Sequence, residues 1–168
     1  MAIDESVMKQ LNMTEEDLVA LLVNDMKKIF CDMAGICNVN NKPRLIDPIN
    51  VFSNSITALV GLAGDYSGLL ALHLPEILAR DFTSKMLGSA VTDMNSDVHD
   101  AIGELATMTS GSLKYHLGNN GNNISISTPS IFTGSEYYYT NNAPEESLAI
   151  LCDVGDQWFM VSLTLKLP

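Results

Sequence analysis

The chain has 168 residues, of which 46% are hydrophobic, and 20 acidic against nine basic residues give it a formal charge of −11. This length fits one domain with a single core, and the apolar content excludes an intrinsically disordered chain. A surface this acidic repels phosphate backbones and anionic lipids, which argues against nucleic acid and membrane surfaces as partners.

The N-terminus, MAIDESVMKQ, is polar and acidic where a secretory signal would be basic and then apolar, so we expect a cytoplasmic protein without a leader. No run of about 20 strongly apolar residues predicts a membrane span. Of the three cysteines, Cys31 and Cys37 lie six residues apart without a CxxC motif, and Cys152 is remote. We expect all three to be reduced, mostly buried thiols.

The first predicted element is a helix that begins after Thr14. Thr14 and Asp17 match a capping box, with Asp in place of the usual Glu. Gly35 and the polar run at 38–43 end the helix. Its apolar residues recur at helical spacing and predict a wide buried stripe: Leu18, Leu21, Leu22, Met26, Ile29, Phe30 and Met33.

The middle of the chain predicts a hairpin and then a short helix. Residues 56–62 and 67–74 are rich in strand-forming residues, and Gly64 and Asp65 between them suit a tight turn. Pro75 and Glu76 open the short helix, and Gly88 ends it. This helix carries Ile77, Leu78, Phe82 and Met86.

A long helix is predicted over residues 97–117, with Asn95 or Ser96 as its N-cap and GNNGNN at 118–123 as its end. Strands are predicted at 124–127, 147–153 and 158–166, the last two joined by a hairpin turn at 154–157. Residues 133–146 form a polar, aromatic loop or a ragged strand. The tyrosines at 137–139 either line an interface or belong to a strand that exposes two of them.

This order of elements indicates an α+β fold, with long helices packed on a largely antiparallel sheet. We expect one domain over residues 1–168, with an N-terminal helix and connecting loop at 1–41 and a core at 42–168.

The long helix contains GELATMTSG at 103–111, and its two sides differ in chemistry. One side is predicted to face the core: Val98, Ala101, Ile102, Leu105, Met108, Thr109, Ser112 and Leu113. The opposite side carries Asp100, Glu104, Thr107, Gly111 and Lys114. A glycine inside a helix costs roughly 0.5–1 kcal/mol relative to alanine, so close approach of another backbone or of a partner should offset it. A solvated face is the alternative interpretation.

Three stretches resemble the CheC/CheX/FliY family of chemotaxis phosphatases, and CheX most of all. They are ITALVGLAGDYSGLLALHLP at 56–75, SDVHDAIGELATMTSGSLKYHL at 96–117 and ISISTPSIFTG at 124–134. The resemblance covers most of the chain after about residue 40. It implies a two-component signalling protein that acts on a CheY-like response regulator as an aspartyl-phosphate phosphatase, a hydrolase. It also implies a homodimer, with no cofactor of its own, because Mg²⁺ would belong to the regulator.

The resemblance also assigns roles to residues. In the family, a Glu-x-x-Asn pattern on this helix pairs the glutamate with a lysine of the regulator, while the asparagine amide positions the attacking water. Glu104 matches the glutamate, and Thr107 stands where the asparagine belongs. The resemblance thus implies Glu104 and Thr107 as the catalytic pair, with Asp100, Gly111 and Lys114 as further partner-binding residues.

Thr107 departs from the family pattern. Threonine is shorter than asparagine, and its hydroxyl tends to bond back to the carbonyl one turn earlier. Two interpretations therefore remain open, a phosphatase with altered chemistry and a relative that docks the regulator but has weakened hydrolysis. A non-catalytic, dimeric structural module is the alternative outside these two.

Other chemistries have little support in the sequence. His73, His99 and His116 show no His-x-x-x-His or His-Cys spacing, so no metal site is expected, and the helix dipole explains His116 near a C-terminus. Nucleotide-binding glycine motifs and the GxSxG motif of serine hydrolases are absent from the sequence.

Overall fold

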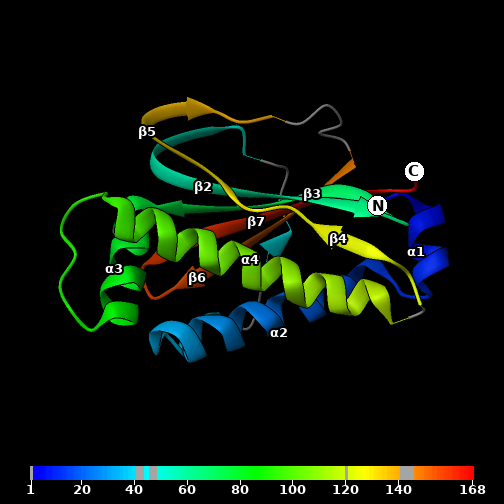
Figure 1. The fold of residues 1–168 in the computed structure, drawn as a ribbon, viewed down its shortest axis with the longest axis horizontal. Coiled ribbons are helices and arrows are strands. Elements are labelled where there is room, and N and C mark those ends of the chain that lie inside the picture. Colours follow the sequence, from blue (N-terminus) through cyan, green and yellow to red (C-terminus); the bar gives the residue numbers. More distant parts are fainter. Residues whose placement is uncertain (1, 41–43, 46–48, 120, 141–145) are drawn as a thin grey trace.

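The computed structural model describes residues 2–40, 44–45, 49–119, 121–140 and 146–168. Four helices and seven strands are found in these residues (Figure 1). In chain order they are α1 (Glu5–Leu11), α2 (Glu15–Ala34), β1 (Arg44–Leu45), β2 (Val51–Gly64), β3 (Ser67–Pro75), α3 (Glu76–Leu87), α4 (Ser96–Gly118), β4 (Ile124–Ile126), β5 (Ser130–Tyr138), β6 (Ser147–Val154) and β7 (Gln157–Lys166).

The strands form one antiparallel sheet in the order β1-β6-β7-β3-β2-β4. The long strand β2 has two partners on its outer edge, because β5 pairs with Val51–Leu59 and β4 pairs with Leu62–Gly64. The predicted α+β fold, with helices packed on a largely antiparallel sheet, is confirmed.

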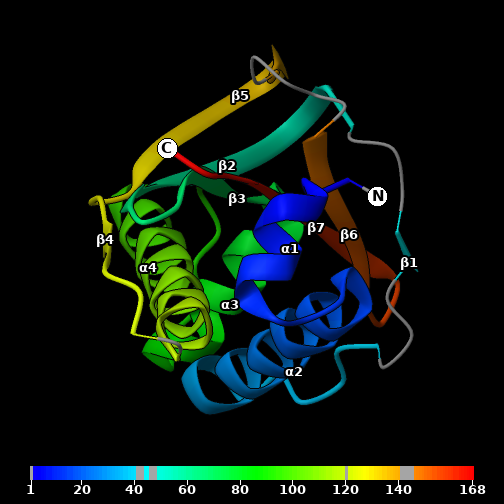
Figure 2. The ribbon, with the colours of Figure 1, turned by 90° about the vertical axis from the view of Figure 1, so that its right-hand side faces the viewer.

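The helices gather on one side of the sheet and cover its main apolar face (Figure 2). Phe30 of α2 lies at the centre of this core, stacked on Phe159 of β7 at 4.8 Å between ring centroids and edge-on to Phe82 of α3 at 5.2 Å. These rings bury large apolar areas and dominate the packing energy of the layer. Among the described residues, no helix is both long and apolar enough to cross a membrane.

The locally encoded features of the sequence are confirmed. The Thr14 hydroxyl accepts from the Asp17 amide at 3.1 Å, and the Asp17 carboxylate accepts from the Thr14 amide at 2.9 Å, which completes the capping box. These hydrogen bonds hold the pKa of Asp17 below its usual value. Gly35 and Gly88 end their helices in the left-handed conformation that glycine adopts without strain.

The first helix, α1, was not predicted from the sequence. Its seven residues bury Val7, Met8 and Leu11 in the core. The Glu15 carboxylate, at the start of α2, accepts from the backbone amides of Ala2 and Ile3 at 2.9 and 3.1 Å. Because a helix this short is unstable alone, tertiary packing holds it rather than its own propensity.

The prediction of three reduced thiols is wrong for two of them. Cys31, in the last turn of α2, and Cys37, just beyond it, form a disulfide with Cα atoms 4.5 Å apart. The left-handed Gly35 reverses the chain at the end of the helix and returns residue 37 to the side of residue 31. Cys152 is a free, buried thiol as predicted, and burial together with the Asp153 charge raises its pKa to about 12.

The segment predicted as a loop or ragged strand at 133–146 contributes residues 133–138 to β5, while 141–145 lie outside the described residues. The prediction of two exposed tyrosines is wrong. Tyr138 is exposed, but Tyr137 packs on Phe52 at 5.6 Å and Tyr139 on His73 at 5.0 Å between ring centroids. These contacts form a second apolar cluster on the sheet face that lies away from the helices.

Candidate functional site

The helix α4 comprises one of the three stretches that carry the family resemblance, and the other two stretches, together with an N-cap, hold it in place. The Asn95 side chain caps it by accepting from the Val98 amide at 3.2 Å. A Cβ at Gly103 would lie 3.4 Å from the Pro129 ring, so glycine lets the strand entry pack closely on the helix. The Gly61 amide of β2 donates to the Ser127 hydroxyl at 2.8 Å, which ties this strand entry to the sheet.

The predicted outward side of α4 is confirmed. Asp100, Glu104, Thr107 and Lys114 are exposed, and Gly111 is half-buried. Glu104 forms no hydrogen bond or ion pair with any described residue, so its carboxylate is available to a partner. Asp100 lies one turn earlier, and two like charges at this spacing destabilise an isolated helix slightly. This arrangement is not optimised for the stability of the helix.

Thr107 uses its hydroxyl within its own helix. The hydroxyl donates to the Gly103 carbonyl oxygen at 3.0 Å, one turn earlier, as the sequence predicted. The hydroxyl proton is thereby occupied, and the oxygen keeps only its acceptor capacity toward a water or a partner. An asparagine amide at this position would offer both a donor and an acceptor.

Gly111 faces open space. A Cβ built on this residue would meet no atom within 4 Å, so no backbone of the described chain approaches it. Its conformation does not require glycine either, because its φ is not positive. Neither packing within the described chain nor backbone geometry therefore accounts for glycine here.

The sequence prediction was wrong for Met108, which it placed toward the core. Met108 is 41% exposed, because it lies one turn after Glu104 on the same side of the helix. Tyr115, one turn after Gly111, is 71% exposed and was not singled out. Tyrosine and methionine are enriched at protein interfaces. We define the α4 face as Asp100, Glu104, Thr107, Met108, Gly111, Lys114 and Tyr115.

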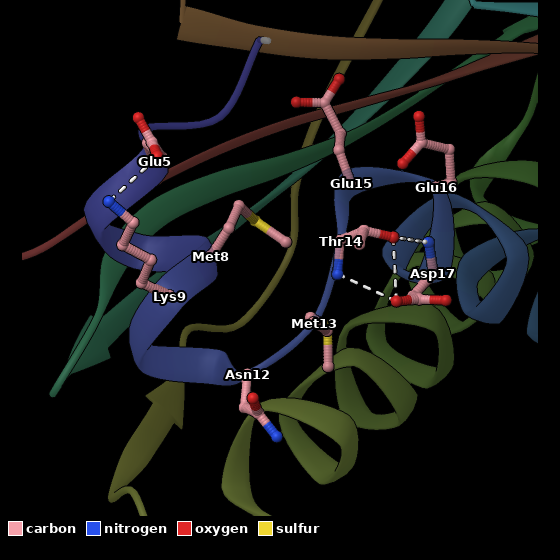
Figure 3. A pocket seen from close by; sticks show the side chains of 9 residues that line it. All are labelled: Glu5, Met8, Lys9, Asn12, Met13, Thr14, Glu15, Glu16 and Asp17. Atoms are coloured by element: carbon pink, nitrogen blue, oxygen red, sulfur yellow. Dashed lines mark hydrogen bonds and ion pairs between the residues drawn. The ribbon is translucent and has the colours of Figure 1, made fainter.

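A hollow of about 400 Å³ lies at the C-terminal end of the α4 face, bordered by Gly111, Lys114, Tyr115 and the amides of Asn119 and Asn122. A larger hollow of about 510 Å³ lies elsewhere, between the end of α1 and the start of α2 (Figure 3). Several polar groups on the larger hollow are already engaged: Thr14 and Asp17 form the capping box, and Glu5 pairs with Lys9 with their charged atoms 2.9 Å apart. We therefore assign it no chemistry.

His73 belongs to a buried polar chain on the other face of the sheet. Its Nδ1 lies 2.8 Å from the Thr57 hydroxyl, which lies 2.8 Å from the Tyr137 hydroxyl, and its Nε2 lies 3.1 Å from the Ser162 hydroxyl. Burial lowers the pKa of His73 to about 3. The ring is therefore neutral at physiological pH, and a group this weakly basic and this buried is structural rather than catalytic.

The other two histidines do not complete a metal site. The Nε2 of His116 in α4 lies 2.7 Å from the Asp25 carboxylate of α2. The sequence explained His116 by the helix dipole alone and did not identify Asp25 as its main partner. This contact, with the Thr109 hydroxyl 3.3 Å from the Met26 sulfur, fixes α4 against α2. Within the described ranges, no group of three or more His, Cys, Asp or Glu is placed to hold a metal ion.

Comparison with known proteins identifies relatives of this chain. The family model described as chemotaxis phosphatase CheX matches residues 56–153. A relative named CheY-P phosphatase CheX, from Thermotoga maritima, is 26% identical over 120 residues, which cover 71% of this chain and 77% of the relative.

Solved structures show the same fold. A chemotaxis protein CheX from Desulfovibrio desulfuricans superimposes with a TM-score of 0.75 at 25% identity, over 89% of this chain and 99% of the other. A chain of the CheX-CheY-BeF3-Mg complex from Borrelia burgdorferi superimposes with a TM-score of 0.67 at 18% identity, over 88% and 97% of the two chains. At that lower identity, the likeness bears on the fold alone.

Proposed function

The chain belongs to the CheX family of chemotaxis phosphatases, and from that premise we propose that its α4 face docks a phosphorylated CheY-type response regulator. The observation that carries the proposal is the exposed, unpartnered Glu104 on a face that also presents Gly111 and two exposed interface-type residues, Met108 and Tyr115. In this arrangement the Glu104 carboxylate pairs with a lysine of the regulator through a charged hydrogen bond.

We further propose that hydrolysis of the regulator's aspartyl phosphate is weak in this chain. An acyl phosphate is already reactive, so the catalyst mainly has to place a water in line with the phosphorus. The Thr107 oxygen can accept from such a water, but its proton is committed to the Gly103 carbonyl oxygen. Loss of one preorganised donor commonly costs about 10²–10³-fold in rate. No metal or cofactor of the chain takes part, and the Mg²⁺ belongs to the regulator.

The experiment that tests this function measures aspartyl-phosphate decay on the CheY-type regulators of the same organism, with wild type and with Thr107→Asn. We expect slight acceleration by the wild type and about 100-fold faster hydrolysis with Thr107→Asn, because the amide restores the missing donor. Equal acceleration by both would mean that another group places the water. Failure of both to bind or to accelerate would contradict docking and favour a structural module.

Glu104→Ala tests the docking step separately. We expect affinity for the regulator to fall about ten- to a hundredfold, the effect of losing a charged hydrogen bond. The melting temperature should not fall, because Glu104 forms no hydrogen bond or ion pair with any described residue and lies one turn from the like-charged Asp100. Glu16→Ala, which removes an exposed glutamate on α2, is the matched control and should leave affinity unchanged. Equal effects of the two variants would point to net charge rather than docking.

We also propose that the chain forms a homodimer through β5. This strand pairs on one side with β2 and has no second partner among the described strands, so its free edge can pair with a second copy. Phe132 and Tyr138 of this strand are 50% and 67% exposed, and Val51 of the adjoining β2 is 55% exposed. Sedimentation velocity should show a dimer that Phe132→Lys dissociates. Ile77→Lys on α3, at 59% exposure, is the control, and a wild-type monomer would contradict the proposal.

A further inference from the structure

Lys114 is one of the few cations in this acidic chain that no carboxylate neutralises. Nine residues are Lys or Arg, and the side chains of seven of them are described. Four of these make ion pairs at 2.8–2.9 Å, and Arg80 donates to the Thr92 carbonyl oxygen at 2.7 Å. Only Lys27 and Lys114 among the described cations have no such partner. Of these two, Lys114 lies on the α4 face.

The surroundings of Lys114 favour an anion. None of the described residues that border the adjoining hollow of about 400 Å³ is acidic. Its polar side chains include those of Asn119 and Asn122, although the Asn122 amide already donates to the Leu117 carbonyl oxygen at 3.0 Å. The acidic residues of the α4 face, Asp100 and Glu104, lie at its other end. One carboxylate bonds to the border of the hollow, because Asp65 accepts from the Asn123 backbone amide at 2.6 Å, so on a protein with a charge of −11 the Lys114 ammonium is the group that favours an anion here.

Gly111 leaves the path from Lys114 toward Thr107 open. Helical side chains lean toward the N-terminus of the helix, so the lysine chain extends over the turn that contains Gly111. A Cβ at Gly111 would meet nothing within 4 Å. The Cα atoms of residues 107 and 114 are separated by about 10 Å along the axis at 1.5 Å per residue, and the lysine chain spans roughly half of that.

We infer that Lys114 is a specificity-determining residue whose ammonium group contacts the phosphoryl group of the docked regulator, extending over Gly111 toward Thr107. The inference rests on the proposed docking function. It gives the face a cationic donor near the position where the family amide is replaced by a hydroxyl whose proton is already used. The contact makes docking selective for the phosphorylated regulator, since an ammonium is attracted to a dianionic phosphoryl group.

The test compares affinity for one CheY-type receiver domain with and without beryllofluoride and Mg²⁺, a stable mimic of the aspartyl phosphate, by titration calorimetry. We expect Lys114→Gln to reduce the preference for the beryllofluoride form roughly tenfold, and Lys114→Arg to retain most of it. Lys27→Gln, which removes the same charge from α2, is the matched control and should leave the preference unchanged. Melting temperatures of all variants verify that they fold.

Three outcomes would overturn the inference. If Lys114→Gln weakens both forms equally, the lysine pairs with a carboxylate of the regulator and not with the phosphoryl group. If it changes neither affinity, Lys114 serves only the dipole at the C-terminal end of the helix. If wild type binds the receiver in neither form, the proposed docking function fails and this inference fails with it. If wild type binds and Lys114→Gln binds with the same affinities, only this inference fails.

Discussion

The Gly111→Ala substitution should change the stability of the protein and its affinity for a partner in opposite directions. Gly111 lies within α4, its φ is not positive, and a Cβ there would meet no atom within 4 Å. Alanine should therefore stabilise the protein by about 0.5–1 kcal/mol, because it loses less backbone entropy on folding. For a chain of this size, the gain corresponds to a rise in melting temperature of about 1–4 °C.

The same methyl group should weaken docking. If a partner packs closely against Gly111, the added methyl overpacks that contact at a cost of about 1–3 kcal/mol, or roughly five- to a hundredfold in affinity. Urea unfolding measures the first effect, and calorimetric titration with a beryllofluoride-treated receiver domain measures the second. Stability and affinity should thus move in opposite directions, which a merely structural helix would not produce.

Asn24→Ala is the matched control for this experiment. Asn24 is exposed on α2, away from the α4 face, and its replacement raises helix propensity by a similar amount, about 0.5 kcal/mol. It should stabilise the protein without changing affinity. Gly111→Ala with unchanged affinity would refute close approach of a partner at this position. Gly111→Ala without a gain in stability would show that something covers Gly111 in the isolated protein.

Three further predictions concern the rest of the fold. Burial lowers the pKa of His73 to about 3, whereas in the unfolded chain it is about 6.5, so the stability that neutral His73 contributes is present above pH 6.5 and is lost as the pH falls toward 3. Urea unfolding should therefore show that this residue lowers the free energy of unfolding by about 2 kcal/mol between pH 7 and pH 5. The His73→Gln variant should lose less stability over the same range, and equal losses in the two proteins would contradict the prediction. Replacing Cys31 and Cys37 together by Ser should lower the free energy of unfolding by about 2 kcal/mol, the loop-closure value for so short a loop. A reductant should lower the stability of the wild type by a similar amount and leave that of the double variant unchanged. Cys152, buried and with a pKa of about 12, should resist iodoacetamide at pH 8 until the chain unfolds, and mass spectrometry showing its alkylation in native protein would argue against that burial.

The features predicted correctly from the sequence are those whose hydrogen bonds join near neighbours. The capping box of Thr14 and Asp17 spans three residues, and Gly35 and Gly88 end helices through their own backbone conformations. The hairpin is equally local, since Gly64 and Asp65 turn β2 into β3. At Gly64 the structure adds a reason, because a Cβ would collide with the Asn123 carbonyl oxygen.

The sequence predictions that failed depended on which other parts of the fold pack against each residue. Periodicity placed Met108 on the side of α4 that faces the core, but the buried side of the helix extends the other way, to Gly103, Ala106 and Ser110. Small side chains contribute little hydrophobicity to a pattern, so the sequence does not mark them as a packed surface. The strand entry at Pro129 packs against Gly103 and shifts the buried side toward it.

The sequence by itself determined the helices α2, α3 and α4, the β2–β3 hairpin and the outward position of Glu104 and Thr107, because periodicity and capping depend on residues a few positions apart. The family resemblance rested on the three matching stretches at 56–75, 96–117 and 124–134. Only the tertiary structure decided the partners of His73 and His116, the disulfide, the place of α1 and β5, and the exposure of Met108 and Tyr115. The partners of His73 and His116 lie 16 to 91 positions away along the chain. Local propensity cannot encode such pairings, which exist only once the core has brought the elements together.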